Sequence, residues 1–397
     1  MKNGRKLMAL ALAGLMTFSL TGCGSKSTGA DGNADSNGAA EIKVGGNFEL
    51  SGDVSTYGNS VMNSIKLAFD EINAKGGVLG KKLVLVERDN KSDTTESTSI
   101  STSLAGDSSI VALIGPVSSG PTMAASQPAI DNKIPLLTPT ATNPNVTVDP
   151  NTGKVKEYIF RSCFLDSFQG QGTAKFASEE LKAKKAAILV DNKSEYSKGL
   201  AKSFEETFTK AGGTIVGTEA FLSEENDFRA ILTKVRNQQP DVIFVPAYYN
   251  AAGKIVKQAR ELGINVPLIG SDGWDSPQLV EIAGAAALNN TYFINHYTPE
   301  DKDPKVQAFV QAYKQKHNQT PDALAALGYD AAYILADAIK TSGDASPEKI
   351  KEALANVKDF QGITGVVTLD EKHNPIKSAV IIEMKDGKQT VNKKVQP

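Results

Sequence analysis

The folded part of the chain opens with Ile42-Lys43-Val44-Gly45-Gly46-Asn47-Phe48, a short apolar stretch that predicts a β-strand. Residues 57–74 carry apolar side chains on one broad face, which predicts a helix, and Gly76-Gly77 is suited to end it. The alternation continues with predicted strands at 83–87, 110–114 and 134–137 and predicted helices at 94–104 and 121–130. Strands and helices in strict turn, with short connections, predict a parallel sheet covered on both faces.

The alternation restarts after residues 143–155, an irregular stretch rich in Asn, Pro and Thr. Its predicted helices are 169–181, 198–210, 228–235 and 250–262, and its predicted strands are 186–190, 214–220, 242–245 and 268–269. The segments 73–77 (NAKGG) and 209–213 (TKAGG) each join a helix to the next strand, at corresponding places in the two halves. We therefore predict an α/β fold of two similar, doubly wound, Rossmann-like lobes.

The chain after Asn290 does not continue the alternation. It offers a strand at 292–295, helices at 306–317, 324–340 and 347–357, and strands at 366–369, 379–384 and 389–395, with Asp386-Gly387 as a turn. Helices without strands between them do not build a third lobe. We expect them to return and cover the first lobe.

The sequence of the N-terminus predicts an export signal. A basic start is followed by an apolar run of 14 residues, Leu7 to Leu20, which is too short for a permanent membrane span of about 20 residues. The ending Leu20-Thr21-Gly22-Cys23 resembles the lipobox of bacterial lipoproteins, which implies cleavage after residue 22 and a lipid anchor on Cys23. The alternative is an ordinary signal peptide with a chance cysteine near the cut.

Residues 23–40 are predicted to form a flexible tether, because beyond Cys23 they contain no apolar residue other than Ala. The folded part then works outside the cytoplasm, held to the bacterial cell membrane.

The composition excludes several classes of protein. The formal charge of the whole chain is -2, and removal of the signal, with Lys2, Arg5 and Lys6, leaves -5, which argues against nucleic acid as a partner. With Cys23 lipidated, Cys163 stands alone, so no intramolecular disulfide is expected. No second apolar run approaches membrane-spanning length, so the protein does not itself form a channel.

Ligands of doubly wound sheets bind beyond the carboxyl ends of the strands, and four loops there stand out. They are residues 50–58, 115–122, 138–144 and 270–275. The hydroxyls of Ser118, Ser119, Thr140 and Thr142, with free amides at a helix start near Gly120, suit a carboxylate. Asp272, in the other lobe, would bind an ammonium group, so the cleft between them would select an α-amino acid. The alternative is that these Ser and Thr residues only cap helices and turns.

Taken in order, several segments of the chain resemble the Leu/Ile/Val-binding proteins, the type I extracytoplasmic solute-binding proteins of branched-chain amino acid ABC transporters. The segments are Ser51-Gly52 through Tyr57-Gly58, Gly115-Pro116 through Ser119, Thr140 through Pro144, Asp191 through Gly199 with Tyr196, Ala247-Tyr248-Tyr249, and Gly270 through Trp274. The resemblance extends from residue 41 to the end of the chain.

This resemblance implies a ligand site with named roles. Ser119 and Thr142 bind the carboxylate, with help from the backbone around Thr140 and Ala141, and Val117 lines the side-chain pocket. Tyr57, Tyr196 and one of Tyr248 or Tyr249 enclose the ligand. Family members often carry Glu where this chain has Asp272, which is one methylene shorter, so either direct contact with the ammonium or a bridging water is expected. Trp274 is expected at the pocket rim, the alternative being that it packs against the hinge.

The resemblance also implies three crossings between the lobes, expected near residues 162–165, 294–297 and 361–364. Lobe 1 would then comprise residues 41–162 and 296–362, and lobe 2 residues 163–295 and 363–397. Three strands joining two lobes form a hinge on which the lobes close around the ligand.

Enzymatic functions are not supported. The sequence has no Gly-x-Gly-x-x-Gly after the first strand, no phosphate-binding loop and no His-Glu-x-x-His, and Ser346-Pro347-Glu348-Lys349 reads as a helix start rather than a Ser-x-x-Lys hydrolase motif. His296, His317 and His373 are expected to be solvated surface or turn residues. We expect no enzyme, cofactor or metal, but a monomer that delivers an amino acid to ABC permease subunits. The alternative is a membrane-tethered sensory receptor for a small amide or amino acid.

Overall fold

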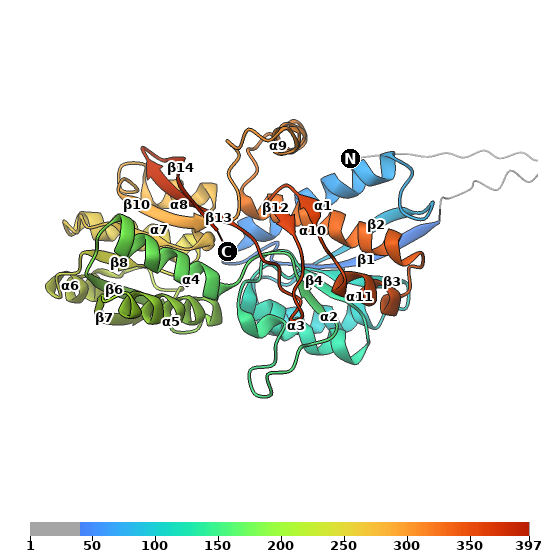
Figure 1. Cartoon of the computed structure of the whole chain (residues 1–397), viewed down its shortest axis with the longest axis horizontal. Coiled ribbons are helices and arrows are strands. Elements are labelled where there is room, and N and C mark those ends of the chain that lie inside the picture. Colours follow the sequence, from blue (N-terminus) through green and yellow to red (C-terminus); the bar gives the residue numbers. More distant parts are fainter. Residues whose placement is uncertain (1–39, 397) are drawn as a thin grey trace, which may run out of the picture. The chain divides into compact units, whose positions relative to one another are not determined.

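The computed structural model describes residues 40–396, and two sheets with helices on both faces dominate it (Figure 1). The first sheet has five strands in the order β2-β1-β3-β4-β5, all parallel. The strands are β1 (Glu41–Phe48), β2 (Lys82–Asp89), β3 (Ile110–Ile114), β4 (Leu136–Thr138) and β5 (Ile159–Arg161). The predicted parallel sheet is confirmed, and β5 is a strand that the sequence pattern did not reveal.

Helices connect these strands, namely α1 (Ser55–Ala74), α2 (Thr94–Ala105), α3 (Ser119–Asp131) and the short η1 (Pro144–Val146). The apolar face of α1 is buried against the sheet. Gly76 and Gly77 follow it with φ of +103° and +74°, a backbone conformation that residues with a Cβ rarely adopt. The glycine pair thus ends the helix and turns the chain into β2.

The second sheet has seven strands in the order β14-β13-β10-β9-β8-β6-β7. Five of them run parallel, while β13 and β14 are added antiparallel at one edge. The strands are β6 (Lys185–Asp191), β7 (Thr214–Phe221), β8 (Val242–Phe244), β9 (Leu268–Gly270), β10 (Thr291–Asn295), β13 (Ala379–Lys385) and β14 (Lys388–Val395). Its helical segments are α4 (Asp166–Lys175), η2 (Phe176–Glu180), α5 (Glu195–Lys210), α6 (Arg229–Asn237), α7 (Tyr249–Glu261), η3 (Asp272–Trp274) and α8 (Pro277–Ala283). The α/β fold of two doubly wound lobes is confirmed.

The late helices return to the first lobe, as expected. They are α9 (Pro304–His317), α10 (Ala323–Ser342) and α11 (Pro347–Ala355), and a small hairpin of β11 (Phe360–Gly362) and β12 (Gly365–Val367) follows them. In Figure 1, α10 lies beside α1. The hydroxyls of Tyr329 and Tyr333 on α10 donate to Glu71 on α1 at 2.5 and 2.7 Å.

The chain leaves the first sheet after β5, returns to the first lobe after β10 and re-enters the second sheet at β13. The expected position of the third crossing, residues 361–364, is wrong. These residues belong to the β11–β12 hairpin, and the chain stays with the first lobe as far as His373, whose carbonyl accepts from Arg161 N at 3.4 Å. A short apolar strand pattern does not reveal which sheet the strand joins. We propose instead that the third crossing lies at residues 375–378.

Some predictions fall outside or at the edge of what the structure describes. The predicted signal peptide (1–22), the lipidation site Cys23 and all but the last residue of the predicted tether lie outside the described residues. Between residues 40 and 396, no helix combines the length and apolarity needed to cross a bilayer. Cys163 is buried as a free thiol, and burial raises its pKa to about 12.

Candidate functional site

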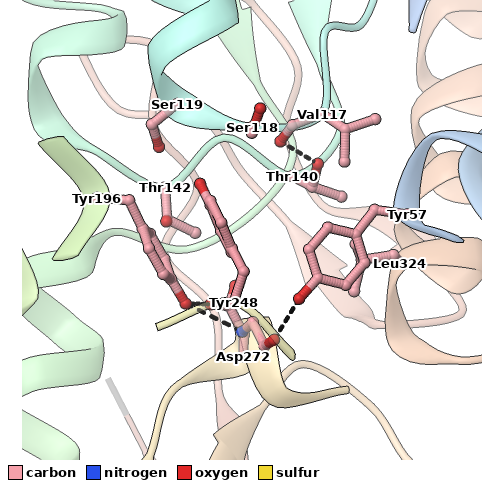
Figure 2. Close-up of a pocket in the computed structure, with 11 residues that line it drawn as sticks. Tyr57, Val117, Ser118, Ser119, Thr140, Thr142, Tyr196, Tyr248, Asp272 and Leu324 are labelled. Carbon is pink, nitrogen blue, oxygen red and sulfur yellow. Dashed lines mark hydrogen bonds between the residues drawn. The ribbon is translucent and has the colours of Figure 1, made fainter. Parts of the chain in front are cut away.

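A small pocket lies where the strand ends of both sheets meet (Figure 2). Its free volume is about 20 Å³, and Figure 2 shows the side chains that line it. Its walls come from loops after β1, β3 and β4 in the first lobe and after β6, β8 and β9 in the second. The lining residues are Tyr57, Val117, Ser118, Ser119, Thr140, Thr142, Tyr196, Tyr248, Asp272, Gly273 and Leu324. The free volume is room for about one water molecule, so an amino acid can enter only if the lobes or the lining side chains move apart.

One end of the pocket carries hydroxyls and the start of a helix. The Thr142 hydroxyl is buried and has no hydrogen-bond partner among the described residues, while Ser119 Oγ accepts from Asn143 N at 3.2 Å. Ser119 is the first residue of α3, where backbone N–H groups have no partner within the helix. Thr140 donates its hydroxyl to Val117 O at 2.6 Å and so fixes two loops to each other. This end offers neutral donors to an anionic group.

Ser118 has a different role from the one expected. Its side chain lines the pocket, but its hydroxyl donates to Glu49 Oε1 at 2.5 Å. The fully buried Glu49 also accepts from the backbone N–H groups of Val117 and Ser118, each at 3.0 Å, and burial raises its pKa. Glu49 thus holds the 117–119 loop against the end of β1. The only sign of this role in the sequence is the position of Glu49 between Phe48 and Leu50, directly after the strand.

The opposite end carries Asp272, which is 6% exposed. Its Oδ1 accepts from the Tyr196 hydroxyl at 2.6 Å, its Oδ2 lies 2.9 Å from His296 Nε2, and its backbone N donates to Gln169 Oε1 at 3.1 Å. Burial raises the pKa of Tyr196 well above its usual value, so the phenol stays protonated and donates. Two partners therefore fix the carboxylate in the pocket wall, and Gln169 fixes the backbone of the same residue.

His296 is buried, and its expected position at the surface is wrong. It is 4% exposed, and its ring stacks on Phe164 with centroids 3.5 Å apart. Burial lowers the pKa of His296, and its Nδ1 has no partner within residues 40–396. An orphan N–H would cost more than an orphan lone pair, so the proton belongs on Nε2, which donates to Asp272. Both His296 and Phe164 lie in segments that cross between the lobes.

Tyrosine rings form the walls between the two ends (Figure 2). Tyr248 stacks on Tyr196 with centroids 4.7 Å apart and meets Tyr57 edge-on at 5.7 Å. The Tyr57 hydroxyl donates to Gly273 O across the lobes and accepts from Tyr249 N at 3.1 Å. Of the two candidates, Tyr248 lines the pocket and Tyr249 supports Tyr57 from behind. Leu324, from α10, completes the wall and was not expected, because it lies far from the other loops in sequence.

Two other expected residues do not reach the pocket. Trp274 is fully buried, and its indole N–H donates to Val245 O at 3.0 Å. Its ring packs over Gly270, where a Cβ would lie 2.2 Å from it, so Trp274 belongs to the core of the second lobe rather than to the rim. Ala141 is buried, and its carbonyl accepts from Arg161 Nη1 at 2.7 Å.

A second buried acid lies close to the hydroxyl end. Asp166 opens α4 and is 1% exposed, and neither of its oxygens has a hydrogen-bond partner in the described part of the chain. Burial raises its pKa well above the usual value despite the nearby Thr142 hydroxyl. An anionic ligand group at Thr142 would thus face a neutral acid.

A wider cleft with a free volume of about 370 Å³ opens beside the pocket. Residues of both lobes line it, including Asp53 and Ser92 from the first and Asp191 and Lys193 from the second. Ser118 and Tyr248 line both cavities, so Tyr248 separates the pocket from the cleft. Within residues 40–396, no group of three His, Cys, Asp or Glu side chains is placed to hold a metal ion.

Comparisons with known proteins identify the family of this chain. The family model for "Periplasmic binding protein" matches residues 41–389. The chain is 32% identical over 333 residues to the Leu/Ile/Val-binding protein BraC3 of Rhizobium johnstonii, covering 84% of this chain and 88% of that one. It is 31% identical to the Leucine-specific-binding protein of Salmonella typhimurium, with the same coverage.

Solved structures give the same result. The substrate-binding protein LivJ of Streptococcus pneumoniae in complex with isoleucine is 41% identical and superposes with a TM-score of 0.84, covering 90% of this chain and all of that one. The leucine-binding protein LivK of Thermotoga maritima is 35% identical with a TM-score of 0.83, covering 90% and 99%. The chain therefore belongs to the periplasmic binding proteins and, among them, to the Leu/Ile/Val-binding protein family.

Proposed function

We propose that this protein captures a branched-chain amino acid, Leu, Ile or Val, by closure of its two lobes and delivers it to an ABC permease. The observation that carries the proposal is the division of one small pocket between neutral donors at Ser119 and Thr142 and a fixed acid at Asp272. A zwitterion satisfies both ends at once. The family consists of substrate-binding proteins rather than enzymes, and relatives are named for binding leucine, isoleucine and valine.

The roles of the residues follow from the geometry. The ligand carboxylate accepts from the Thr142 hydroxyl, from Ser119 and from the first N–H groups of α3, and the ammonium donates to Asp272. Val117, Leu324 and the tyrosine rings offer apolar contacts to the ligand side chain when the lobes close around it. An affinity near micromolar corresponds to about 8 kcal/mol, which a small headgroup and a few buried methyl groups supply.

The site of action is part of the same proposal. Family members work outside the cytoplasm, and the lipobox-like Leu20-Thr21-Gly22-Cys23 would anchor this one to the membrane as a monomer. Metabolic labelling with a radioactive fatty acid should mark the wild-type protein but not Cys23→Ala. Equal labelling of both would reject the anchor.

Calorimetric titration of residues 24–397 with the twenty amino acids tests the ligand. We expect Leu, Ile or Val to bind best, and Asp272→Ala to weaken binding at least ~100-fold, because it leaves a buried ammonium without its partner. Asp53→Ala, an exposed acid of the outer cleft, is the matched control and should bind normally. A preference for another ligand class, or equal binding by Asp272→Ala, would reject the assignment.

Uptake of labelled leucine tests the delivery step. A strain lacking this protein should recover uptake with the wild-type gene and not with Asp272→Ala. If binding is normal but uptake does not depend on the protein, the sensory receptor becomes the better explanation.

A further inference from the structure

Asp275 forms a hydrogen bond between the lobes outside the ligand pocket. It follows η3 in the second lobe and is 3% exposed. Its Oδ2 accepts from the backbone N–H of Ala323 at 2.8 Å. Ala323 is the first residue of α10, which packs on α1 in the first lobe.

The second lobe holds this carboxylate in a fixed direction. Asn295 Nδ2, at the end of β10, donates to Oδ2 at 2.9 Å, and Gln389 Nε2, on β14, donates to Oδ1 at 2.6 Å. The α10 helix has its own cap in Asp322, which accepts from Ala325 N at 2.8 Å. Asp275 is therefore a second acceptor at this helix start, supplied by the other lobe, where the helix dipole favours a negative charge.

The bond joins the two walls of the ligand pocket without entering it. Asp272 and Gly273 of η3 lie three and two residues before Asp275, and Leu324 is the residue after Ala323. All three line the pocket, whereas Asp275 and Ala323 do not. The bond thus holds the ammonium-binding loop against the apolar wall.

We propose that Asp275 is a closure residue, whose bond to the start of α10 stabilises the closed arrangement of the lobes and so raises ligand affinity without touching the ligand. This inference rests on the proposed function, since closure around an amino acid is what makes the bond matter. Opening of the lobes about the hinge separates η3 from α10 and breaks the bond, whereas the bonds from Asn295 and Gln389 remain within the second lobe.

Two substitutions remove the bond from opposite sides. Asp275→Ala removes the acceptor, and with it the bond to Ala323 N. Ala323→Pro removes the donating N–H at the first helical position, where proline is tolerated, and the preceding Asp322 already has the extended ψ of 178° that proline requires. Ala323→Gly keeps the N–H and is the control.

Each of the two variants should bind leucine about tenfold more weakly than wild type, and the double variant no more weakly than Ala323→Pro alone, because both remove one interaction. Additive losses, or unchanged affinity in either variant, would overturn the proposal. Thermal unfolding of each variant checks that it is folded, with Ala323→Gly setting the baseline for α10.

Small-angle scattering of the ligand-free proteins separates this proposal from the choice of ligand. Asp275→Ala and Ala323→Pro should have a larger radius of gyration than wild type and Ala323→Gly. An equal radius in all four proteins would overturn the closure role even if leucine binds. If wild type binds no amino acid but the two variants still have a larger radius than wild type, the proposed ligand is rejected and the closure role of Asp275 stands.

Discussion

The acid that we propose as the ammonium acceptor is held in place by its neighbours. Asp272 is one methylene shorter than Glu, but Tyr196, His296 and Gln169 fix its carboxylate and backbone at the pocket wall. A fixed acceptor loses no side-chain entropy when the ligand arrives. If Asp272 binds the ligand as proposed, His296 is a positioning residue that acts on the ligand through Asp272.

His296→Ala should weaken leucine binding about tenfold, because Asp272 loses a donor worth about 1.5 kcal/mol and gains freedom to move. His296→Gln, which retains an N–H donor, should recover part of the loss. Calorimetry on both variants measures this. Equal affinities in wild type and His296→Ala would show that the contact is structural only.

Asp166, the second buried acid, should tolerate loss of its charge, in contrast to Asp272. Burial raises the pKa of Asp166, so its neutral isostere Asn changes little, and Asp166→Asn should bind leucine within about threefold of wild type. The same calorimetric series that contains Asp272→Ala provides the comparison. A hundredfold loss in Asp166→Asn would mean that Asp166 contacts the ligand as an anion.

At this scale the sequence predicts the binding loops better than their supports. Ser119, Thr142 and Asp272 could be named because hydroxyls and acids after strand ends point to a ligand. Glu49 and His296 could not, because a single Glu or His carries no sign of burial until the surrounding elements are placed. Trp274 was misassigned because the sequence does not show that Gly270 leaves room for its ring beneath the loop.

Among the elements, α10 contacts both lobes and the β11–β12 hairpin. Its first turn meets Asp275, its face packs on α1, and Asp330 in its middle accepts from Ile363 N at 2.6 Å and from Thr364 N at 2.9 Å. The buried Lys377 bonds the Thr364 hydroxyl and also donates to Ser162 O at 3.2 Å. Asp330 therefore anchors the β11–β12 hairpin and, through Lys377, reaches two of the segments that join the lobes.

Asp330→Ala should lower the free energy of unfolding by about 3–5 kcal/mol, because Lys377 would stay buried without a nearby acid and two backbone N–H groups would lose their acceptor. Urea denaturation measures the loss. Asp337→Ala, exposed on the same helix, should change stability by less than about 0.5 kcal/mol. Similar stabilities of the two variants would contradict the anchor role.

The regular alternation of strands and helices in the sequence predicts most of the elements. It does not predict which neighbouring strands pair with each other. Most strands of both sheets agree with the predicted apolar runs. The central strands β3, β4 and β8 are buried, whereas the edge strand β14 is largely exposed. Residues 361–364 are expected at the hinge but lie in the β11–β12 hairpin. The two strands of this hairpin pair with each other rather than with a strand of either large sheet. Neither β5 nor α8 has a pattern long enough to show in the sequence.

At the scale of the whole molecule, the lobes meet around several buried acids, and this makes stability depend on pH. Burial and the nearby Asp275 raise the pKa of Asp322 to about 7, against 3.8 for an unperturbed Asp. Between these two values the folded protein binds a proton that the unfolded chain does not. Protonation of Asp322 therefore stabilises the folded protein fully below pH 3.8, and this stabilisation is lost as the pH rises through 7.

Wild-type protein should accordingly become more stable by about 1–3 kcal/mol between pH 8 and pH 5. Asp322→Asn, which retains a good helix cap, should show a smaller gain. Urea denaturation at pH 5, 6.5 and 8 measures both. An equal pH dependence in the two proteins would show that Asp322 does not take up the proton.

The central claim is that one pocket between two lobes holds both charged ends of an amino acid. A crystal structure of the protein with leucine tests it most directly. We predict the carboxylate at Ser119 and Thr142, the ammonium at Asp272, and the side chain against Val117 and Leu324. Leucine bound away from these residues, or bound in the reverse orientation, would contradict the account.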